Sequence, residues 1–336
     1  MEITSPFLNS LIERSKKKKV TMVFPEAYNA RVLAAASALA SLDAIVPVLL
    51  GDPSKTASIA SENNLDLSKC VILDNTEELR EKTKQEFLKV SDEFSEKALG
   101  RRFADAQYLA AALVRTKQYD CLTSGFGSAT EEAVMACKMM LGMQEGISVV
   151  SSFCILEAPD FKGSEGSLLC FTDCVVVPNP NNRELAEIAI LACDTARKLL
   201  GWEPRAALLS FSTKGSAENE NTRKVIEAVE IANQLRPDLL IEGEYQLDTA
   251  IDPAVAEKKV KVDNKVAGRA NILVFPDLNA GNIGVKLVNY FANLPVHGAL
   301  LQGLTVPTVE CSRSASVEQI MGALLMLAVS VGEDKE

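Results

Sequence analysis

Short apolar runs of strand length alternate along most of the chain with longer stretches of helical spacing. The apolar runs lie at residues 20–24, 45–50, 70–73, 121–124, 206–210, 239–241 and 271–275. Helical patterns lie at residues 29–42, 77–100, 105–115, 131–141, 183–200, 220–235, 281–293 and 316–331. This alternation is typical of parallel sheets covered by helices. We therefore expect an α/β protein with largely parallel sheets.

A chain of 336 residues is long for one core and predicts two domains, each of roughly 100–200 residues. The pattern changes at about residue 148, where two extended segments, 148–157 and 167–177, flank a polar loop and resemble a hairpin. We place the domain junctions near residues 147 and 296. Domain I would then comprise residues 1–147 and 297–336, and domain II residues 148–296, both of the α/β class.

The charge and the apolar pattern exclude several classes of partner. A net charge of −10 argues against nucleic acid, which requires clustered Lys and Arg. No apolar run approaches the roughly 18 residues of a membrane span. The start of the chain has no signal-peptide core, because its lysine run at 16–19 follows polar sequence. We therefore expect a cytoplasmic protein with no nucleic-acid or membrane partner.

Cysteine and histidine content limits the available chemistry. The eight cysteines contain no CxxC pair, so buried reduced thiols are favoured over a metal or redox site. His297 is the only histidine, and a Ser-His-Asp triad or a multi-histidine metal site would have to use it. We therefore set aside hydrolase triads and zinc sites, and expect no metal.

Three polar segments follow predicted strands, where α/β proteins place their ligands. The glycine-containing segment 125–130 opens a helix, and its amides could hold a phosphate or simply form a tight turn. Segment 210–216 could bind an anion, or Ser216 could cap the next helix. Segment 276–282 could bind a ligand or supply turn residues. The residues alone leave each pair of alternatives open.

A fourth polar segment precedes the last predicted helix. Arg313 could hold a phosphoryl group through two hydrogen bonds, and Ser312 offers a hydroxyl beside it. Ser316 and Gln319 have the spacing of a capping box. Both roles can hold together, because the cap and the ligand would use different side chains.

Taken together, these segments resemble the phosphate acetyltransferase family and the related phosphate butyryltransferases. The stretches that carry the resemblance are 209–217 (LSFSTKGSA), 242–251 (EGEYQLDTAI), 266–271 (VAGRAN), 275–284 (FPDLNAGNIG), 302–304 (QGL) and Ser312-Arg313. Pro25-Glu26 and Arg31 fit the N-terminal half of the family, so the resemblance covers essentially the whole chain. It implies two α/β domains of the isocitrate dehydrogenase-like kind, an active-site cleft between them, and a homodimer.

The resemblance also implies a reaction and a set of site residues. Acyl-CoA and phosphate would exchange the acyl group, giving acyl phosphate and free CoA, with acetyl-CoA the default substrate and no permanently bound cofactor. Ser312 would lie near the thiol and the reacting carbonyl, Arg313 would bind the phosphoryl group, and Arg31 would meet a CoA phosphate. Further CoA or phosphate contacts are expected at Ser124, Gly125, Thr130, Asn279, Gly281, Asn282, Lys286 and Gln302.

The chain departs from the family pattern at three positions. Gln319 stands where the family has an aspartate proposed as the base for the CoA thiol, and an amide accepts no proton at neutral pH. Met135 replaces an expected arginine, and Val285 an expected tyrosine. These departures leave three interpretations: an acetyltransferase with another base, a propionyl- or butyryltransferase, and a non-catalytic acyl-CoA-binding protein of the same fold.

Overall fold

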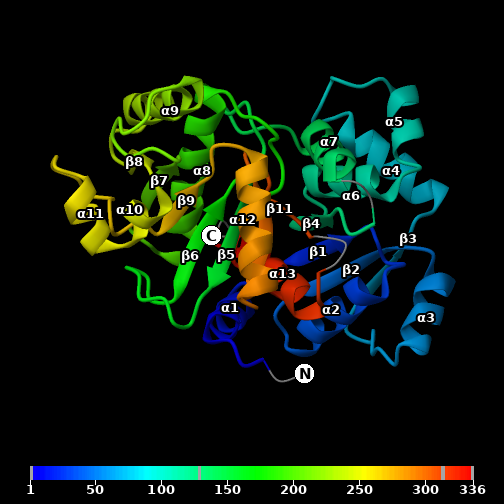
Figure 1. Cartoon of the computed structure of the whole chain (residues 1–336). Coiled ribbons are helices and arrows are strands. Elements are labelled where there is room, and N and C mark those ends of the chain that lie inside the picture. The colour runs from blue at the N-terminus through cyan, green and yellow to red at the C-terminus, as the bar shows by residue number, and fades with distance from the viewer. Residues whose placement is uncertain (1–2, 128–129, 312–314, 334–336) are drawn as a thin grey trace. The chain divides into compact units, whose positions relative to one another are not determined.

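The computed structural model describes residues 3–127, 130–311 and 315–333 of the chain. The chain divides into two compact units. Unit 1 comprises residues 1–144 and 304–336, and unit 2 comprises residues 145–303. Each unit contains both helices and strands, so the predicted α/β class is confirmed (Figure 1).

Unit 1 is built on a fully parallel sheet with the strand order β3-β2-β1-β4-β11. These strands are β1 (Thr21–Phe24), β2 (Val46–Gly51), β3 (Val71–Asp74), β4 (Cys121–Ser124) and β11 (Thr308–Glu310). The helices of the unit are α1 (Pro6–Lys17), α2 (Ala30–Ser41), α3 (Pro53–Glu62), α4 (Glu77–Phe87), α5 (Glu96–Arg102), α6 (Ala106–Arg115), α7 (Thr130–Leu141) and α13 (Val317–Gly332). Because all five strands run the same way, their carboxyl ends share one edge of the sheet.

Helix α13 forms the centre of unit 1. Every residue from Ile320 to Gly332 is buried, as expected for a helix that is apolar on all sides. It packs against α1, α2 and β11. The short strand β11, which the sequence analysis missed, joins the sheet beside β4 and leads into the segment before this helix.

Unit 2 has a mixed sheet with the strand order β10-β5-β6-β9-β7-β8. The strands are β5 (Ser151–Glu157), β6 (Leu168–Thr172), β7 (Arg205–Leu209), β8 (Leu240–Tyr245), β9 (Ile272–Val274) and β10 (Val296–Gln302). The helices are α8 (Asn182–Leu200), α9 (Glu220–Leu235), α10 (Leu247–Ile251), α11 (Pro253–Lys259) and α12 (Leu278–Phe291). β5 pairs antiparallel with both β6 and β10, so the expected hairpin is present, and the remaining pairs are parallel.

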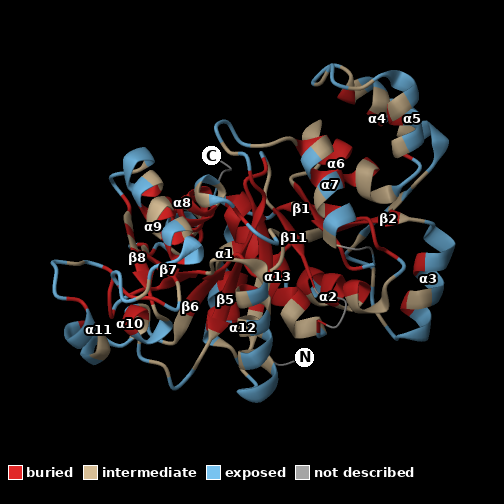
Figure 2. Ribbon diagram, turned by 45° about the horizontal axis from the view of Figure 1, so that its top comes forward, coloured by how far each residue is buried: buried red, intermediate tan, exposed pale blue. Residues whose placement is uncertain are grey.

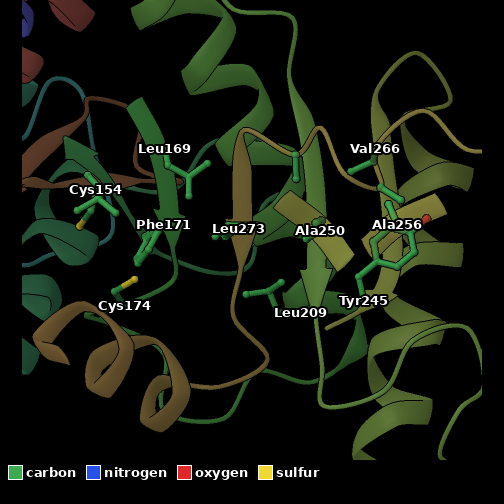
Figure 3. Packing of buried hydrophobic residues seen from close by; sticks show 14 of the residues in the cluster. Cys154, Leu169, Phe171, Cys174, Leu209, Tyr245, Ala250, Ala256, Val266 and Leu273 are labelled. Atoms are coloured by element: carbon green, nitrogen blue, oxygen red, sulfur yellow. The ribbon is translucent and has the colours of Figure 1, made fainter. Parts of the chain in front are cut away.

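Side chains from neighbouring strands form the core of unit 2. Figure 3 shows Phe171 of β6, Leu273 of β9 and Leu209 of β7 along successive strands, with Tyr245 of β8 beyond them. The rings of Phe171 and Phe275 pack edge to face, with 5.4 Å between their centroids. This packing fixes the strand ends from which the loops of unit 2 depart.

Three boundaries differ from the sequence expectations. The helix expected at 77–100 is two helices, because Ser95 caps the start of α5 and Phe94 packs on Phe87. The extended segment expected to reach residue 177 ends at Thr172, where the Asp173 side chain binds the following amides. Residues 297–302, which the sequence analysis grouped with the first domain, pair with β5, and unit 2 therefore runs to Gly303.

Candidate active site

A cluster of polar groups lies at the carboxyl edge of the unit 1 sheet. Glu26 follows β1, Gly125 follows β4, and Glu310 ends β11, and these three strands are neighbours in the sheet. Gly125 has φ +87°, and a Cβ at this residue would lie 2.7 Å from Cγ of Glu310. Only glycine fits there, because both the left-handed backbone and the close carboxylate exclude a side chain.

Glu26 is buried and accepts hydrogen bonds from the loop that follows β4. The backbone N–H groups of Gly125 and Phe126 both donate to its Oε1, at 3.1 Å each. Its other oxygen, Oε2, accepts no hydrogen bond from the described residues. Burial raises the pKa of Glu26 to about 7, although the two amides act in the opposite direction. Glu26 is thus a carboxyl group that can change its charge near neutral pH.

Two of the expected site residues contact this cluster. The Thr130 hydroxyl donates to Oε1 of Glu310 at 2.8 Å. Ser124 is fully buried at the end of β4, and its Oγ accepts from the Cys137 thiol at 3.7 Å. The structure therefore brings Ser124, Gly125 and Thr130 together around a carboxylate, Glu310, that the sequence analysis did not select.

The expected reacting pair, Ser312 and Arg313, lies outside the described residues. The described residues on its C-terminal side are firmly held: Nη1 of Arg31 donates to the Ala315 carbonyl at 2.8 Å. The capping box at Ser316 and Gln319 is confirmed. Gln319 N donates to Ser316 Oγ at 3.2 Å, and Ser316 N to Gln319 Oε1 at 2.9 Å.

A cavity of about 1080 Å³ opens within unit 1 beside Glu26. Tyr28, Gln107 and Met135 contribute to its wall together with Glu26. Met135, which replaces an expected arginine, is half exposed there. The wall at this position is therefore apolar, and the cavity is large enough for a small organic ligand.

Other expected residues belong to the start of α12 in unit 2. Asn282 donates through Nδ2 to the Cys174 carbonyl at 3.1 Å. A Cβ on Gly281 would lie 2.3 Å from the Asp173 carbonyl oxygen, so the helix approaches this loop too closely for any side chain. Asn279 and Lys286 are exposed on the same helix. Gly281 and Asn282 thus fix the position of α12, and Asn279 and Lys286 remain open to solvent.

The remaining expected contact, Gln302, ends β10 and is buried in unit 2. Its Oε1 accepts from the Thr195 hydroxyl at 2.6 Å, and its Nε2 donates to Ser151 Oγ at 3.2 Å. Both ends of the amide therefore hold α8 and β5 in place.

The structure resolves the two interpretations of segment 210–216. Ser212 Oγ and the Gly215 amide both donate to Oε1 of the buried Glu244, at 2.9 and 2.8 Å. The cap of α9 is Asn219, which shares a capping box with Thr222. This loop therefore binds a carboxylate of its own chain, and Ser216 is not the helix cap.

Several other reactive groups serve as structural elements. All eight cysteines are free thiols. Burial raises the pKa of Cys137 to about 11 and that of Cys193 above its ordinary range. Nε2 of His297 lies 3.2 Å from Oε2 of Glu157. Among the described residues no cluster of His, Cys, Asp and Glu could hold a metal ion.

Glu26 and Glu310 are site residues that the sequence motifs did not indicate. Glu26 was part of the family resemblance, and its position directly after a strand and Pro25 was the available signal. Glu310 offered no such signal, because the strand that carries it has three residues. Both carboxylates become visible only when the strand order places their ends at one edge of the sheet.

Several known proteins are similar to this chain over nearly its whole length. The profile of the family described as phosphate acetyl/butaryl transferase matches residues 6–328. A phosphate acetyltransferase from Clostridium acetobutylicum is 40% identical over 96% of this chain and 97% of its own. One from Bacillus subtilis is 37% identical over 94% and 96%, respectively. A phosphotransacetylase structure from Streptococcus pyogenes superposes with a TM-score of 0.88 at 32% identity, covering 98% of this chain and 99% of the other.

These matches span nearly the whole of each chain. This protein therefore belongs to the phosphate acetyl/butaryl transferase family, a family of acyltransferases. The resemblance drawn from the sequence motifs is confirmed.

Proposed function

We propose that this protein transfers an acetyl group reversibly between coenzyme A and phosphate, giving acetyl phosphate and free CoA. The observation that carries the proposal is the chain-long similarity to relatives named phosphate acetyltransferase, at 35–40% identity. CoA and acetyl-CoA act as substrates, and the reaction joins a thiol or phosphate nucleophile to an acyl carbon. The enzyme contributes position and stabilisation of the charge that develops on the carbonyl oxygen.

We place the reacting centre at Ser312 and Arg313, with Arg31 and Lys286 as cations for the phosphates of the substrates. A guanidinium is suited to a phosphoryl group because it donates two parallel hydrogen bonds. The position of Arg31 supports this proposal, since its guanidinium reaches Ala315 just beyond the pair. The exposed Lys286 is consistent with a contact to an anionic ligand.

The proposal is tested by turnover. Purified protein should convert acetyl phosphate and CoA to acetyl-CoA, with propionyl and butyryl phosphate as comparison substrates. We expect acetyl phosphate to have the highest kcat/KM. A preference for butyryl phosphate would reassign the acyl group, and tight CoA binding without turnover of any donor would indicate a non-catalytic protein. Arg313→Ala should raise the KM for acetyl phosphate strongly; an unchanged KM would place the phosphate elsewhere.

We also propose that the protein forms a homodimer through the outer face of α12. Ile283, Leu287, Tyr290 and Phe291 are spaced to lie on one side of this helix, and Tyr290 and Phe291 are 74% and 86% exposed. Figure 2 shows the end of α12 as exposed. An apolar stripe of this kind is typical of an interaction surface. Light scattering should give the mass of two chains for the wild-type protein and the mass of one chain for Phe291→Asp. The control Val262→Asp, at an exposed residue in a loop outside α12, should keep the mass of two chains.

A cytoplasmic location completes the proposal. It is supported by the free thiols, which are typical of reducing compartments, and by CoA and phosphate as substrates. Among the described residues, no helix has the length and apolar character needed to cross a membrane. Fractionation of cells that express a tagged chain should recover the protein with cytoplasmic markers.

A further inference from the structure

Glu26 combines features that the fold does not require. Oε1 already anchors the loop after β4 through Gly125 and Phe126. Oε2 has no hydrogen-bond partner among the described residues, although the side chain is only 5% exposed. A buried polar atom without a partner is costly, so its retention indicates a role other than stability.

The position of Glu26 is that of a ligand site. It lies at the carboxyl edge of β1, β4 and β11, the place where parallel sheets bind their ligands. It lines the cavity of about 1080 Å³ within unit 1. Glu310, at the end of β11, packs over Gly125 at the same edge, immediately before the segment that contains Ser312.

The surroundings of Glu26 determine its charge. Burial raises its pKa to about 7, and the carboxylate of Asp105 adds to this effect. The other ionisable groups that face it or line its cavity are Tyr28, Arg101, Tyr108, Glu131, Glu132 and Cys137. At neutral pH both charge states of Glu26 are populated, and this is the condition under which a group transfers protons best in both directions.

Three other described groups in unit 1 are less suited to accept a proton from a bound thiol. Gln319 is an amide whose oxygen is used in the capping box of α13. Burial raises the pKa of Cys137 to about 11, so this thiol stays protonated at neutral pH. Glu310 already accepts from the Thr130 hydroxyl. At this edge of the sheet, Oε2 of Glu26 is a buried carboxylate oxygen without a hydrogen-bond partner among the described residues.

We propose that Glu26 accepts the proton of the CoA thiol when that thiol attacks an acyl phosphate, and returns it in the reverse reaction. The inference rests on the proposed acetyl transfer between CoA and phosphate. In the forward step the S–H bond breaks and sulfur forms a bond to the acyl carbon. The C–O bond to phosphate breaks, and its electron pair leaves on the phosphate oxygen. The thiol proton moves to Oε2, so the glutamate becomes neutral as phosphate is released.

The test compares Glu26→Gln with wild type across pH 6.5–9. Glutamine keeps an oxygen for the Gly125 and Phe126 amides but cannot take a proton. We expect kcat to fall about 100-fold at pH 7, with little change in the KM for acetyl phosphate. The deficit should shrink to less than about 10-fold at pH 9, because a free thiol with a pKa near 8.5 then ionises without a base.

The matched control is Glu93→Gln, the same chemical change at an exposed carboxyl outside the cavity, and it should alter kcat less than about 2-fold. An equal deficit for Glu26→Gln at every pH would indicate a purely structural role and overturn the inference, as would full activity. For the wild-type protein, the pH profile of kcat should rise along a limb with an apparent pKa near 7. If Glu26→Gln fails to fold, the absence of that limb decides against the inference.

The same experiment separates the two proposals. If the wild-type protein is active and the Glu26→Gln variant keeps full activity, the role of Glu26 is wrong and the proposed acetyl transfer is still supported. No wild-type turnover with any acyl phosphate would overturn both.

Discussion

Glu26 in unit 1 and Asp173 in unit 2 have similar local surroundings but differ in how many of their oxygens accept hydrogen bonds. Each carboxyl is buried, each follows a strand of its sheet, and each accepts backbone N–H groups from nearby residues. Asp173 uses both oxygens: the amides of Val175, Val176 and Val177 donate to it at 2.7–3.3 Å, and Ser152 donates through its amide and its hydroxyl. Glu26 uses one oxygen.

The difference indicates which carboxyl is structural and which is available for chemistry. Burial raises the pKa of both, but the hydrogen bonds to Asp173 oppose this effect at both of its oxygens. A buried carboxylate whose two oxygens both accept hydrogen bonds is stabilised less by a proton than one with an oxygen that lacks a partner. The loop at Asp173 holds α12, and the loop at Glu26 borders a cavity.

The largest expected effect is the loss of Asp173. Asp173→Ala would leave the partly buried amides of Val175 to Val177 without their acceptor and release the loop that contacts α12. We expect a loss of about 3–5 kcal/mol in the free energy of unfolding, measured by urea denaturation. Asp194→Ala, which removes a half-exposed ion pair with Arg236, should cost no more than about 1 kcal/mol. Equal losses in the two variants would show that Asp173 is not a structural centre.

Glu26 should affect stability in a pH-dependent way. Its pKa is about 7 in the folded protein against 4.5 for the exposed group, so the folded chain keeps a proton that the unfolded chain releases. The contribution of Glu26 to stability is therefore largest below pH 4.5 and falls as the pH rises to about 7, by about 3 kcal/mol in total. Glu26→Gln should lack this decline. Urea denaturation of both proteins at pH 5 and pH 8 measures it, and parallel curves would contradict the raised pKa.

The contact between α12 and the Asp173 loop can be tested with two glycines of one helix. Gly281→Ala would place a methyl group against the Asp173 carbonyl, with 2.3 Å of separation before relaxation. We expect a loss of about 1–3 kcal/mol and a lower Tm. Gly284→Ala meets only the edge of the Phe275 ring at 3.3 Å and gains helix propensity, so it should stay within about 1 kcal/mol of wild type. Similar Tm values for the two variants would show that the approach at Gly281 is not tight.

Sequence patterns predicted the fold well where periodicity was strong. The helices at residues 183–200 and 220–235 lie within a few residues of their expected positions, as do the strands β1, β2, β3, β4, β7, β8 and β9. Two strands were missed: β11, whose three residues give no measurable alternation, and the seven-residue β10, which was assigned to no element. The extended run to residue 177 was overestimated, since the side chain of Asp173 competes with the sheet for the amides that follow.

The candidate site was predicted less completely than the fold. Motifs located Ser124, Gly125 and Thr130, but they did not reveal that a carboxylate, Glu310, lies among them. That contact joins residues far apart in the sequence and depends on the order of β4 and β11. Partners of this kind follow from sheet topology, which a single sequence does not specify.

The smallest expected effect separates helix capping from proton transfer. Gln319 stands in the first turn of α13, and its side-chain oxygen accepts from the Ser316 amide at 2.9 Å. Gln319→Ala removes this hydrogen bond but keeps the complementary one from the position 319 amide to Ser316 Oγ, so we expect a loss of about 0.5–1 kcal/mol in stability. Because the proton passes to Glu26, kcat at pH 7 should change less than about 2-fold, and the pH profile should keep its limb near 7. A shifted limb in Gln319→Ala, with Glu26→Gln unaffected, would move the proton transfer to the start of α13 and make Glu26 as structural as Asp173.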